Sequence, residues 1–232
     1  MREASPDLLC SLTLISQHGA SAWLTALPLK QHNFWLHKGD FRDALCLRYN
    51  WPLKFIASTC ICGQQQSVEH ALSCSRGGFP TLRHNEVRDI TASYLSEVRS
   101  NVTVEPHLQP LSGESLRLAT SNNDDAARVD IAVDGFWTNS SRAFFDVRVF
   151  NPHAQSNASL SPTAAYRRHE REKSRAYEQR ICEVEHGSFT PLIFSASGGM
   201  GPLASTFYKR LADLLSEKWD IPYSKAMCLI RC

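Results

Sequence analysis

The sequence predicts a mixed α/β (α+β) domain in which helices flank a central sheet of mixed strand direction. From residue 83 onward, helical and strand patterns follow in the order helix, strand, strand, strand, helix, strand, helix. Residues 128–150 have the alternation and the polar turn of a β-hairpin. We therefore expect a helical segment at residues 1–58, a zinc knuckle at 59–80 and the α/β domain at 81–232.

The composition is that of an ordinary globular protein, with 232 residues, a hydrophobic fraction of 43% and a net charge of +2. No apolar run is long enough to span a bilayer. The run at residues 8–15 lacks a basic flank and a cleavage site, so we expect a helix and not a signal peptide. Without a secretory signal, we predict a nuclear or cytoplasmic protein whose eight cysteines are thiols or metal ligands.

Residues 1–58 predict short helices that pack against a neighbouring part of the molecule. A helical stripe from Leu8 to Ile15 follows Ser5 and Pro6, which suit the start of a helix. A second short helix is expected near residues 41–49. Nothing in this segment indicates catalysis.

Four side chains between residues 60 and 74 have the spacing of a structural zinc site. Cys60 and Cys62 lie in a turn that Gly63 permits. His70 and Cys74 are four residues apart, so they share one face of the helix predicted there. Three thiolates and one imidazole complete a tetrahedral shell and leave no open position for catalysis. The alternative is three unrelated thiols and a surface histidine.

The first helix of the α/β domain is predicted from residue 83 to about residue 98. Its inward face would carry Val87, Ile90, Tyr94, Leu95 and Val98. Four polar residues crowd its first turns, namely Arg83, His84, Glu86 and Arg88, and a solvated helix start is their plain explanation. A short strand is expected at residues 101–105, and the polar segment 110–127 is expected to be a loop.

Two aspartates of the predicted hairpin are candidate functional residues. In the first strand, Asp130 is expected on the face opposite Val129 and Ile131. In the second strand, Asp146 shares a face with Arg148. An ionised carboxylate among aliphatic residues is costly unless it is paired or metal-bound. The two acids could therefore hold a divalent cation, or each could pair with an arginine of the opposite strand.

A long charged helix is predicted over residues 163–185. Its inward stripe would carry Tyr166, Lys173, Tyr177, Ile181 and Val184. A lysine on this stripe is either functional or a snorkelling residue in a helix seam. The arginines off the stripe include Arg167, Arg168, Arg171 and Arg175. A strand at 189–195, a glycine-rich turn at 197–202 and a helix at 203–219 complete the domain. The turn could meet a phosphate, although a plain turn is the commoner case.

The element order and the acids resemble the PD-(D/E)xK restriction-endonuclease-like core. In that family, an aspartate of one strand and an acid followed by x-Lys in the next surround a Mg²⁺ ion. Here Val129-Asp130 stands where Pro-Asp is usual, and Asp146-Val147-Arg148 stands where Asp/Glu-x-Lys is usual. Arg148 departs from the family pattern, because arginine does not shuttle protons at neutral pH.

A narrower resemblance covers residues from about 20 to 220 and concerns the C-terminal region of non-LTR retrotransposon reverse-transcriptase polyproteins. In these proteins a zinc knuckle precedes a restriction-like endonuclease. The knuckle, then Arg83-His84-Asn85, then the two acids, then Lys173 with Tyr177 follow the family's order. The chain is too short for a reverse-transcriptase core, and we expect it to be a piece of a longer polyprotein.

The resemblance implies an endonuclease that cuts DNA with Mg²⁺ or Mn²⁺, beside a structural Zn²⁺. The ligands of the catalytic ion would be Asp130 and Asp146, with Glu86 or Glu105. The other catalytic residues would be Arg148, Lys173 and Tyr177. DNA phosphates, or those of RNA, would meet Arg83, His84, Arg167, Arg168, Arg171 and Arg175. The alternatives are a catalytically dead nucleic-acid-binding module of a decayed retroelement, and a structural or protein-interaction domain.

Overall fold

The structure is a computed structural model that describes residues 12–17, 19–25, 35–49, 51–109, 127–157 and 159–231. Its helices are α2 (Ala22–Thr25), α3 (Lys38–Arg48), α4 (Val68–Ser73), α5 (Phe79–Val98), α6 (Pro162–Glu183), α7 (Pro202–Trp219) and α8 (Tyr223–Arg231). Its strands are β1 (Thr103–Val104), β2 (Ile131–Asp134), β3 (Arg142–Phe150) and β4 (Ser188–Ser195). The first predicted helix is seen at residues 12–15, whereas its predicted start and the loop at 110–126 lie outside the described residues.

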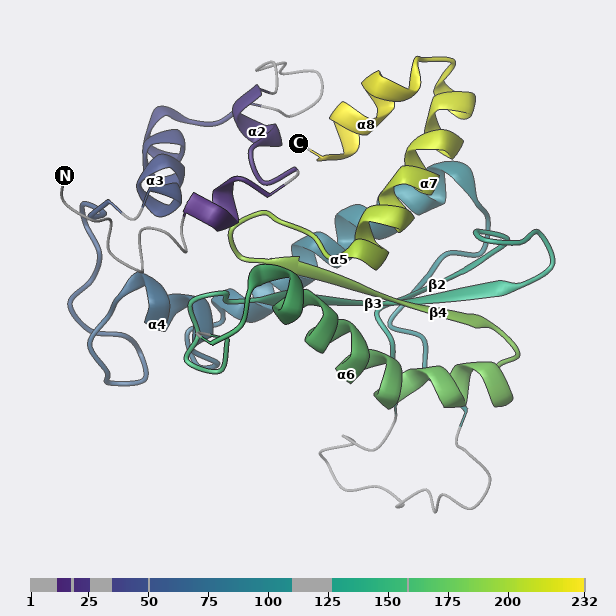
Figure 1. Ribbon diagram of the computed structural model, residues 1–232, viewed down its shortest axis with the longest axis horizontal. Helices are drawn as coiled ribbons and strands as arrows, with labels where there is room; N and C mark the ends of the chain where they lie inside the picture. The colour runs from purple at the N-terminus through teal and green to yellow at the C-terminus, as the bar shows by residue number, and fades with distance from the viewer. Residues whose placement is uncertain are drawn as a thin grey trace.

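The four strands form one mixed sheet in the order β1-β2-β3-β4. The pairs β1–β2 and β2–β3 are antiparallel, and β4 runs parallel to β3 after the crossover through α6. Helices α5 and α7 cover one face of the sheet and α6 covers the other (Figure 1). The predicted mixed α/β architecture with flanking helices is confirmed.

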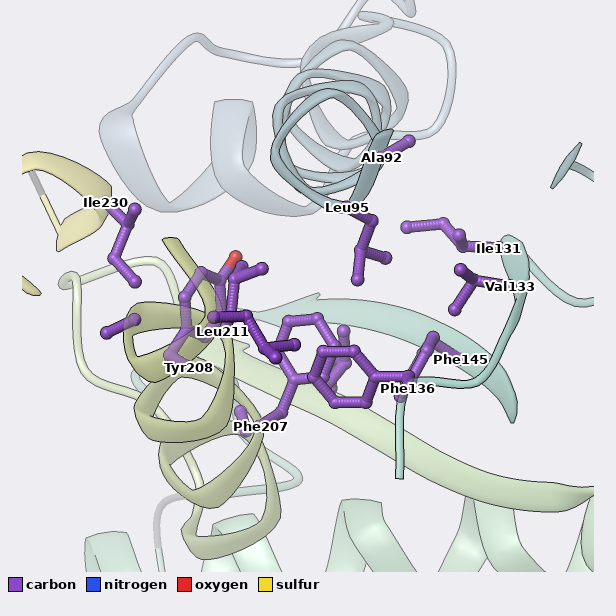
Figure 2. Close-up of a cluster of buried hydrophobic side chains, with 14 of the residues drawn as sticks. Ala92, Leu95, Ile131, Val133, Phe136, Phe145, Phe207, Tyr208, Leu211 and Ile230 are labelled. Atoms are coloured by element: carbon purple, nitrogen blue, oxygen red, sulfur yellow. The ribbon is translucent and has the colours of Figure 1, made fainter. Parts of the chain in front are cut away.

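The main core lies between the sheet and the helices α5 and α7. Three phenylalanine rings form its centre, with Phe136 4.8 Å from Phe207 and Phe145 4.7 Å from Phe207 between ring centroids (Figure 2). Leu95 of α5 and Leu211 of α7 close over them and are fully buried. This core fixes the β2–β3 hairpin, which carries both aspartates.

Two details of the predicted packing are wrong. Ile90 was expected to point inward on α5, but it is 56% exposed, and its neighbour Thr91 is buried instead. Val129 was expected on the same face as Ile131, but it packs with Ala132 under α6. The second error arises because strict alternation starts only at residue 131, where β2 begins.

The N-terminal segment is fastened to the domain, as its predicted packing role requires. The Arg48 guanidinium donates to the carbonyls of Ala20 at 3.1 Å and Ile15 at 3.3 Å, which holds α3 against the first helical turn. The Tyr166 hydroxyl of α6 donates to Gln17 Oε1 at 2.9 Å. Gln17, in the described part of this segment, thus lies against α6.

The glycine-rich turn at 197–202 is a plain strand-to-helix connection. Glu170 of α6 is buried, and its Oε1 accepts the Leu203 N–H at the start of α7 at 3.0 Å. A carboxylate therefore occupies the position at which a phosphate would bind a helix N-terminus.

Candidate metal centres

Cys60, Cys62, His70 and Cys74 converge, and their ligand atoms all lie within 4.8 Å of one another. Cys60 Sγ is 3.8 Å from Cys74 Sγ, and Cys62 Sγ is 3.2 Å from His70 Nε2. Tetrahedral zinc with Zn–S bonds of about 2.3 Å has S–S edges of about 3.8 Å. The cluster could therefore bind a metal ion such as zinc through the four predicted ligands.

Short-range hydrogen bonds shape this cluster. Gly63 has a left-handed φ of 87° and donates its N–H to the Cys60 carbonyl at 2.8 Å, which turns the chain between the first two ligands and the rest. Ser67 caps α4 by accepting the His70 N–H at 3.0 Å. The helix then places Cys74 one turn beyond His70. The turn and the helix predicted for the knuckle are both present.

The knuckle is tied to the end of strand β3. Arg83, in the first turns of α5, donates to the carbonyls of Leu72 at 3.5 Å and Val149 at 3.4 Å. Asn151 donates to Ser73 Oγ at 3.2 Å. Leu72 and Ser73 directly precede Cys74, so the Cys/His cluster and the strand that carries Asp146 share two links. Burial lowers the pKa of Arg83. The side chain of Arg83 links the knuckle to β3 through its hydrogen bonds.

Asp130 lies where β2 separates from β3. Its N–H donates to the Phe145 carbonyl at 3.1 Å, and its Oδ2 accepts the Val147 N–H at 2.6 Å. The carboxylate therefore takes the place of the main-chain carbonyl that would continue the antiparallel ladder. His84 Nε2 lies 3.2 Å from the same oxygen. The hydrogen bond to Asp130 is the main reason that the pKa of His84 is raised.

Asp146 is the buried acid of the site, with a side chain only 5% exposed. Its Oδ2 lies 2.6 Å from the Lys173 ammonium of α6. Burial raises the pKa of Asp146 to about 6, while Lys173 opposes the shift and the charge of Asp130 adds to it. Asp130 directly precedes β2, Asp146 lies within β3, and the charge of Asp130 acts on Asp146. Asp130 contacts His84 of α5, whereas Asp146 contacts Lys173 of α6.

Lys173 and Tyr177 lie one turn apart on α6, as their spacing predicts. The Lys173 ammonium is 5.6 Å from the centroid of the Tyr177 ring. Tyr177 packs against Phe189 of β4, with ring centroids 5.7 Å apart. Burial, and then the charge of Asp146, raise the pKa of Tyr177, so its hydroxyl keeps its proton. The Lys173 ammonium, whose side chain is 23% exposed, points to Asp146 and not into solvent, so the alternative of a snorkelling lysine is wrong.

The other acids and Arg148 have different neighbours. Arg148 pairs with Glu172 at 2.8 Å, and Glu105 pairs with Arg88. Glu86 is exposed on α5. Among the described residues, the Cys/His cluster is the one group of three or more ligand side chains within 4.8 Å, so the hairpin site offers two carboxylates. The alternative of arginine pairs across the hairpin is wrong, because the acids lie against His84 and Lys173 instead.

The arginines of α6 form an exposed stripe away from the acids. Arg167, Arg171 and Arg175 are exposed and follow one another at four-residue spacing. Arg168 is held by the Ser156 carbonyl at 2.7 Å and by Glu172 at 3.5 Å. Two residues advance an α-helix by about 200°, so this stripe lies on roughly the opposite side of α6 from Lys173.

Sequence reasoning missed two residues that hold the candidate sites in place. Glu172 contacts Arg148, and Asn151 links β3 to the knuckle. A signal for Glu172 was present in the sequence. Glu172 directly precedes Lys173, and Arg148, a residue of opposite charge, follows Asp146 by two residues. For Asn151, the pattern Asn-Pro after a strand indicates only a turn.

The raised pKa of Asp146 predicts how stability varies with pH when no divalent metal is added. In the folded chain the pKa is about 6, against an ordinary value of 3.8. Between these values the folded state holds a proton that the unfolded chain has lost, so stability falls as pH rises from about 4 to about 6. The fall is at most about 3 kcal/mol, because one pKa unit corresponds to about 1.4 kcal/mol. Urea unfolding at both ends of this range measures it.

Asp146→Asn is the control for this pH dependence, since the amide does not titrate. His84, whose pKa is raised, contributes stability below its ordinary value of 6.5 that is lost only at higher pH. The two residues therefore act in separate windows. An unchanged slope between about pH 4 and pH 6 in Asp146→Asn would exclude Asp146 as its source.

No helix within the described ranges has the length and apolar character needed to cross a membrane. No protein-family model and no curated protein matches this sequence. Two groups of side chains are therefore the candidates for function: the Cys/His cluster, which could bind a metal such as zinc, and the pair Asp130 and Asp146, of which Asp146 contacts Lys173.

Proposed function

We propose that the chain is a metal-dependent DNA endonuclease domain of a retrotransposon-derived protein. The observation that carries the proposal is the buried Asp146, which lies 2.6 Å from the Lys173 ammonium and whose pKa is raised in part by the nearby charge of Asp130. Two carboxylates with a cation beside them are the group that phosphodiester hydrolysis with Mg²⁺ requires. A nearby cation favours the ionised form of the buried Asp146 carboxyl group, and either the Lys173 ammonium or a metal ion can be that cation.

The fold supports the same proposal. A helix, three antiparallel strands, a crossover helix and a fourth parallel strand follow in the order that suggested the PD-(D/E)xK core. Asp146 comes from β3, Asp130 directly precedes the neighbouring strand β2, and Lys173 comes from the crossover helix between β3 and β4. The family pattern has a lysine two residues after the second acid, where this chain has Arg148. In the proposed site, Lys173 of α6 supplies the amine instead.

Each residue has a role in the proposed reaction. Asp130 and Asp146 would hold Mg²⁺ or Mn²⁺ through their carboxylates. The chemistry that such an ion supplies is polarisation of the scissile phosphate and a lower pKa for an attacking water. Lys173 would move from Asp146 to the phosphate oxygens and offset their charge. Tyr177, whose hydroxyl keeps its proton, would donate a hydrogen bond to the DNA backbone.

The zinc knuckle has a structural role in this proposal. Zn²⁺ in the Cys60–Cys74 cluster would fix α4, and the links of Arg83 and Asn151 would fix β3 in turn. DNA or RNA is the proposed partner, and the nucleus or cytoplasm is the proposed location. The arginine stripe of α6 would contact phosphates outside the cleavage site, because it faces away from Lys173.

Nicking of supercoiled plasmid tests the proposal. The protein with Mg²⁺ or Mn²⁺ should convert supercoiled plasmid to the open circle, and EDTA should stop the reaction. Salt-sensitive binding without cleavage would favour a dead nucleic-acid-binding module instead. The observation favouring that alternative is that Arg148 replaces the usual lysine and pairs with Glu172. Absence of both cleavage and salt-sensitive binding would leave a protein-interaction domain.

Replacement of Lys173 by Met is expected to lower the nicking rate about a hundredfold, since it removes one preorganised charge at the phosphate. The change should affect the rate at saturating DNA more than DNA affinity. Lys209, an exposed lysine of α7, provides the control variant Lys209→Met, which should nick at the wild-type rate. Equal rates for Lys173→Met and Lys209→Met would remove Lys173 from the mechanism.

A further inference from the structure

Two ion pairs of opposite polarity join β3 to α6. Asp146 Oδ2 of the strand meets the Lys173 ammonium of the helix at 2.6 Å. Arg148 Nη1 of the strand meets Glu172 Oε2 of the helix at 2.8 Å. Asp146 and Arg148 share one face of β3, since they are two residues apart. Glu172 and Lys173 are adjacent in sequence. The second pair therefore lies directly beside the first.

Glu172 gathers three basic side chains. Besides Arg148, Arg168 Nε approaches Glu172 Oε1 at 3.5 Å, and His169 Nδ1 approaches Oε2 at 3.4 Å. His169 is buried and packs on the Phe150 ring, with centroids 4.5 Å apart. The carboxylate is thus held from its own helix and from the strand at once. Networks of this kind restrict a side chain more than one isolated surface pair does.

We propose that Arg148 and Glu172 are positioning residues that set the register of α6 against β3 and thereby hold Lys173 at Asp146. Arg148 then does not stand in for the catalytic lysine of a D-x-K sequence. It serves because a planar guanidinium keeps a fixed direction toward a carboxylate, which the flexible ammonium of lysine does not. The effect of this positioning on cleavage rests on the proposed nuclease function. The effect on the position of Lys173 does not depend on that function.

The pair is expected to act on position more than on stability. The side chains of Arg148 and Glu172 are 37% and 44% exposed, so solvent screens their attraction. Lys173 is only 23% exposed and reaches its partner through a long flexible chain. A small displacement of α6 is therefore enough to free the ammonium while the fold persists.

Acetylation of lysines by a short pulse of acetic anhydride, read by mass spectrometry, tests the proposal without any cleavage. Lys173 is expected to react about threefold faster in Glu172→Gln and in Arg148→Met, the range in which a partly exposed pair acts. Lys225, which is exposed, is the internal reference and should react equally in all proteins. Unchanged Lys173 reactivity in both variants would overturn the proposal.

Glu97→Gln is the matched control, because it breaks another partly exposed pair between elements. Glu97 Oε2 of α5 lies 3.2 Å from Lys218 Nζ of α7, with side chains 48% and 47% exposed. Lys173 should react at the wild-type rate in this variant. Faster Lys173 labelling here would show that loss of any such pair loosens the protein, and the assignment to Arg148 and Glu172 would fail.

The nicking assay separates positioning from catalysis at Arg148. If Arg148 stood in for the usual lysine, Arg148→Lys would restore the family pattern and raise the rate. Positioning predicts instead that Arg148→Lys lowers the maximal rate, that Glu172→Gln lowers it at least as much, and that the double variant is no worse than Glu172→Gln. A faster Arg148→Lys enzyme would overturn the proposal. An inactive wild type would refute the nuclease function, while the acetylation result would still decide the positioning role.

Discussion

Asp146→Asn is expected to lower plasmid nicking by at least about a thousandfold, which corresponds to about 4 kcal/mol of transition-state stabilisation. The amide keeps the size of the side chain but loses the charge that a divalent ion needs. It also loses the partner of Lys173, which lies 2.6 Å away. Asp130→Asn is expected to have a similar effect, although its Oδ2 also supports β3 through Val147. Single-turnover nicking with saturating Mg²⁺ measures both.

Asp134→Asn is the matched control for these variants. Asp134 ends β2, the strand that Asp130 precedes, and its side chain is 43% exposed. Its Oδ2 accepts from Asn101 at 3.0 Å, and its Oδ1 lies 3.8 Å from Arg142 Nε. Its loss should leave nicking within about twofold of wild type, as expected for an exposed surface pair. Nicking that survives in Asp146→Asn at the rate of Asp134→Asn would show that the hairpin acids do not carry the reaction.

Removal of zinc is expected to have the second largest effect. Binding of Zn²⁺ in structural sites is worth on the order of 10 kcal/mol, and this energy is coupled to folding. Cys74→Ser should therefore release the metal and lower the melting temperature. The damage should spread beyond the knuckle, because Arg83 and Asn151 link it to β3. Amide exchange should accelerate at α4 and at the first turns of α5.

Cys182→Ser is the control for the zinc experiment, since Cys182 is an exposed free thiol of α6. It should retain one equivalent of zinc and the wild-type melting temperature. The metal is measured by mass spectrometry after mild purification. Less than about half an equivalent of zinc in wild type, or full zinc in Cys74→Ser, would argue against the Cys₃His site.

The elements of the fold could be predicted because local patterns determine them. Period-two alternation predicted β3, and a charged helical pattern with an inward apolar stripe predicted α6. Both predictions lie within a few residues of the observed bounds. The knuckle was predictable because its ligand spacing is a local property. The turn at Gly63 and the cap at Ser67 are short-range features as well.

The partners of the site residues could not be predicted, because they depend on how the elements meet. Asp130 lies at the point where β2 leaves β3, and no pattern in the sequence marks that point. Arg148 was expected to be catalytic from its position after Asp146. In the structure α6 packs so that Arg148 forms an ion pair with Glu172. Arg83 looked like a phosphate contact, yet it donates to carbonyls of α4 and β3. Long-range packing decided each of these cases.

The proposed function requires Asp130 and Asp146 to share one divalent ion. Crystals soaked in Mn²⁺ and measured for anomalous scattering test it most directly. We expect one strong peak between the two carboxylates, with an oxygen of each about 2.2 Å from the metal. We also expect Lys173 to have moved away from Asp146. Absence of the peak at a Mn²⁺ concentration that saturates nicking, or a peak that contacts only one of the two aspartates, would rule out a shared catalytic ion.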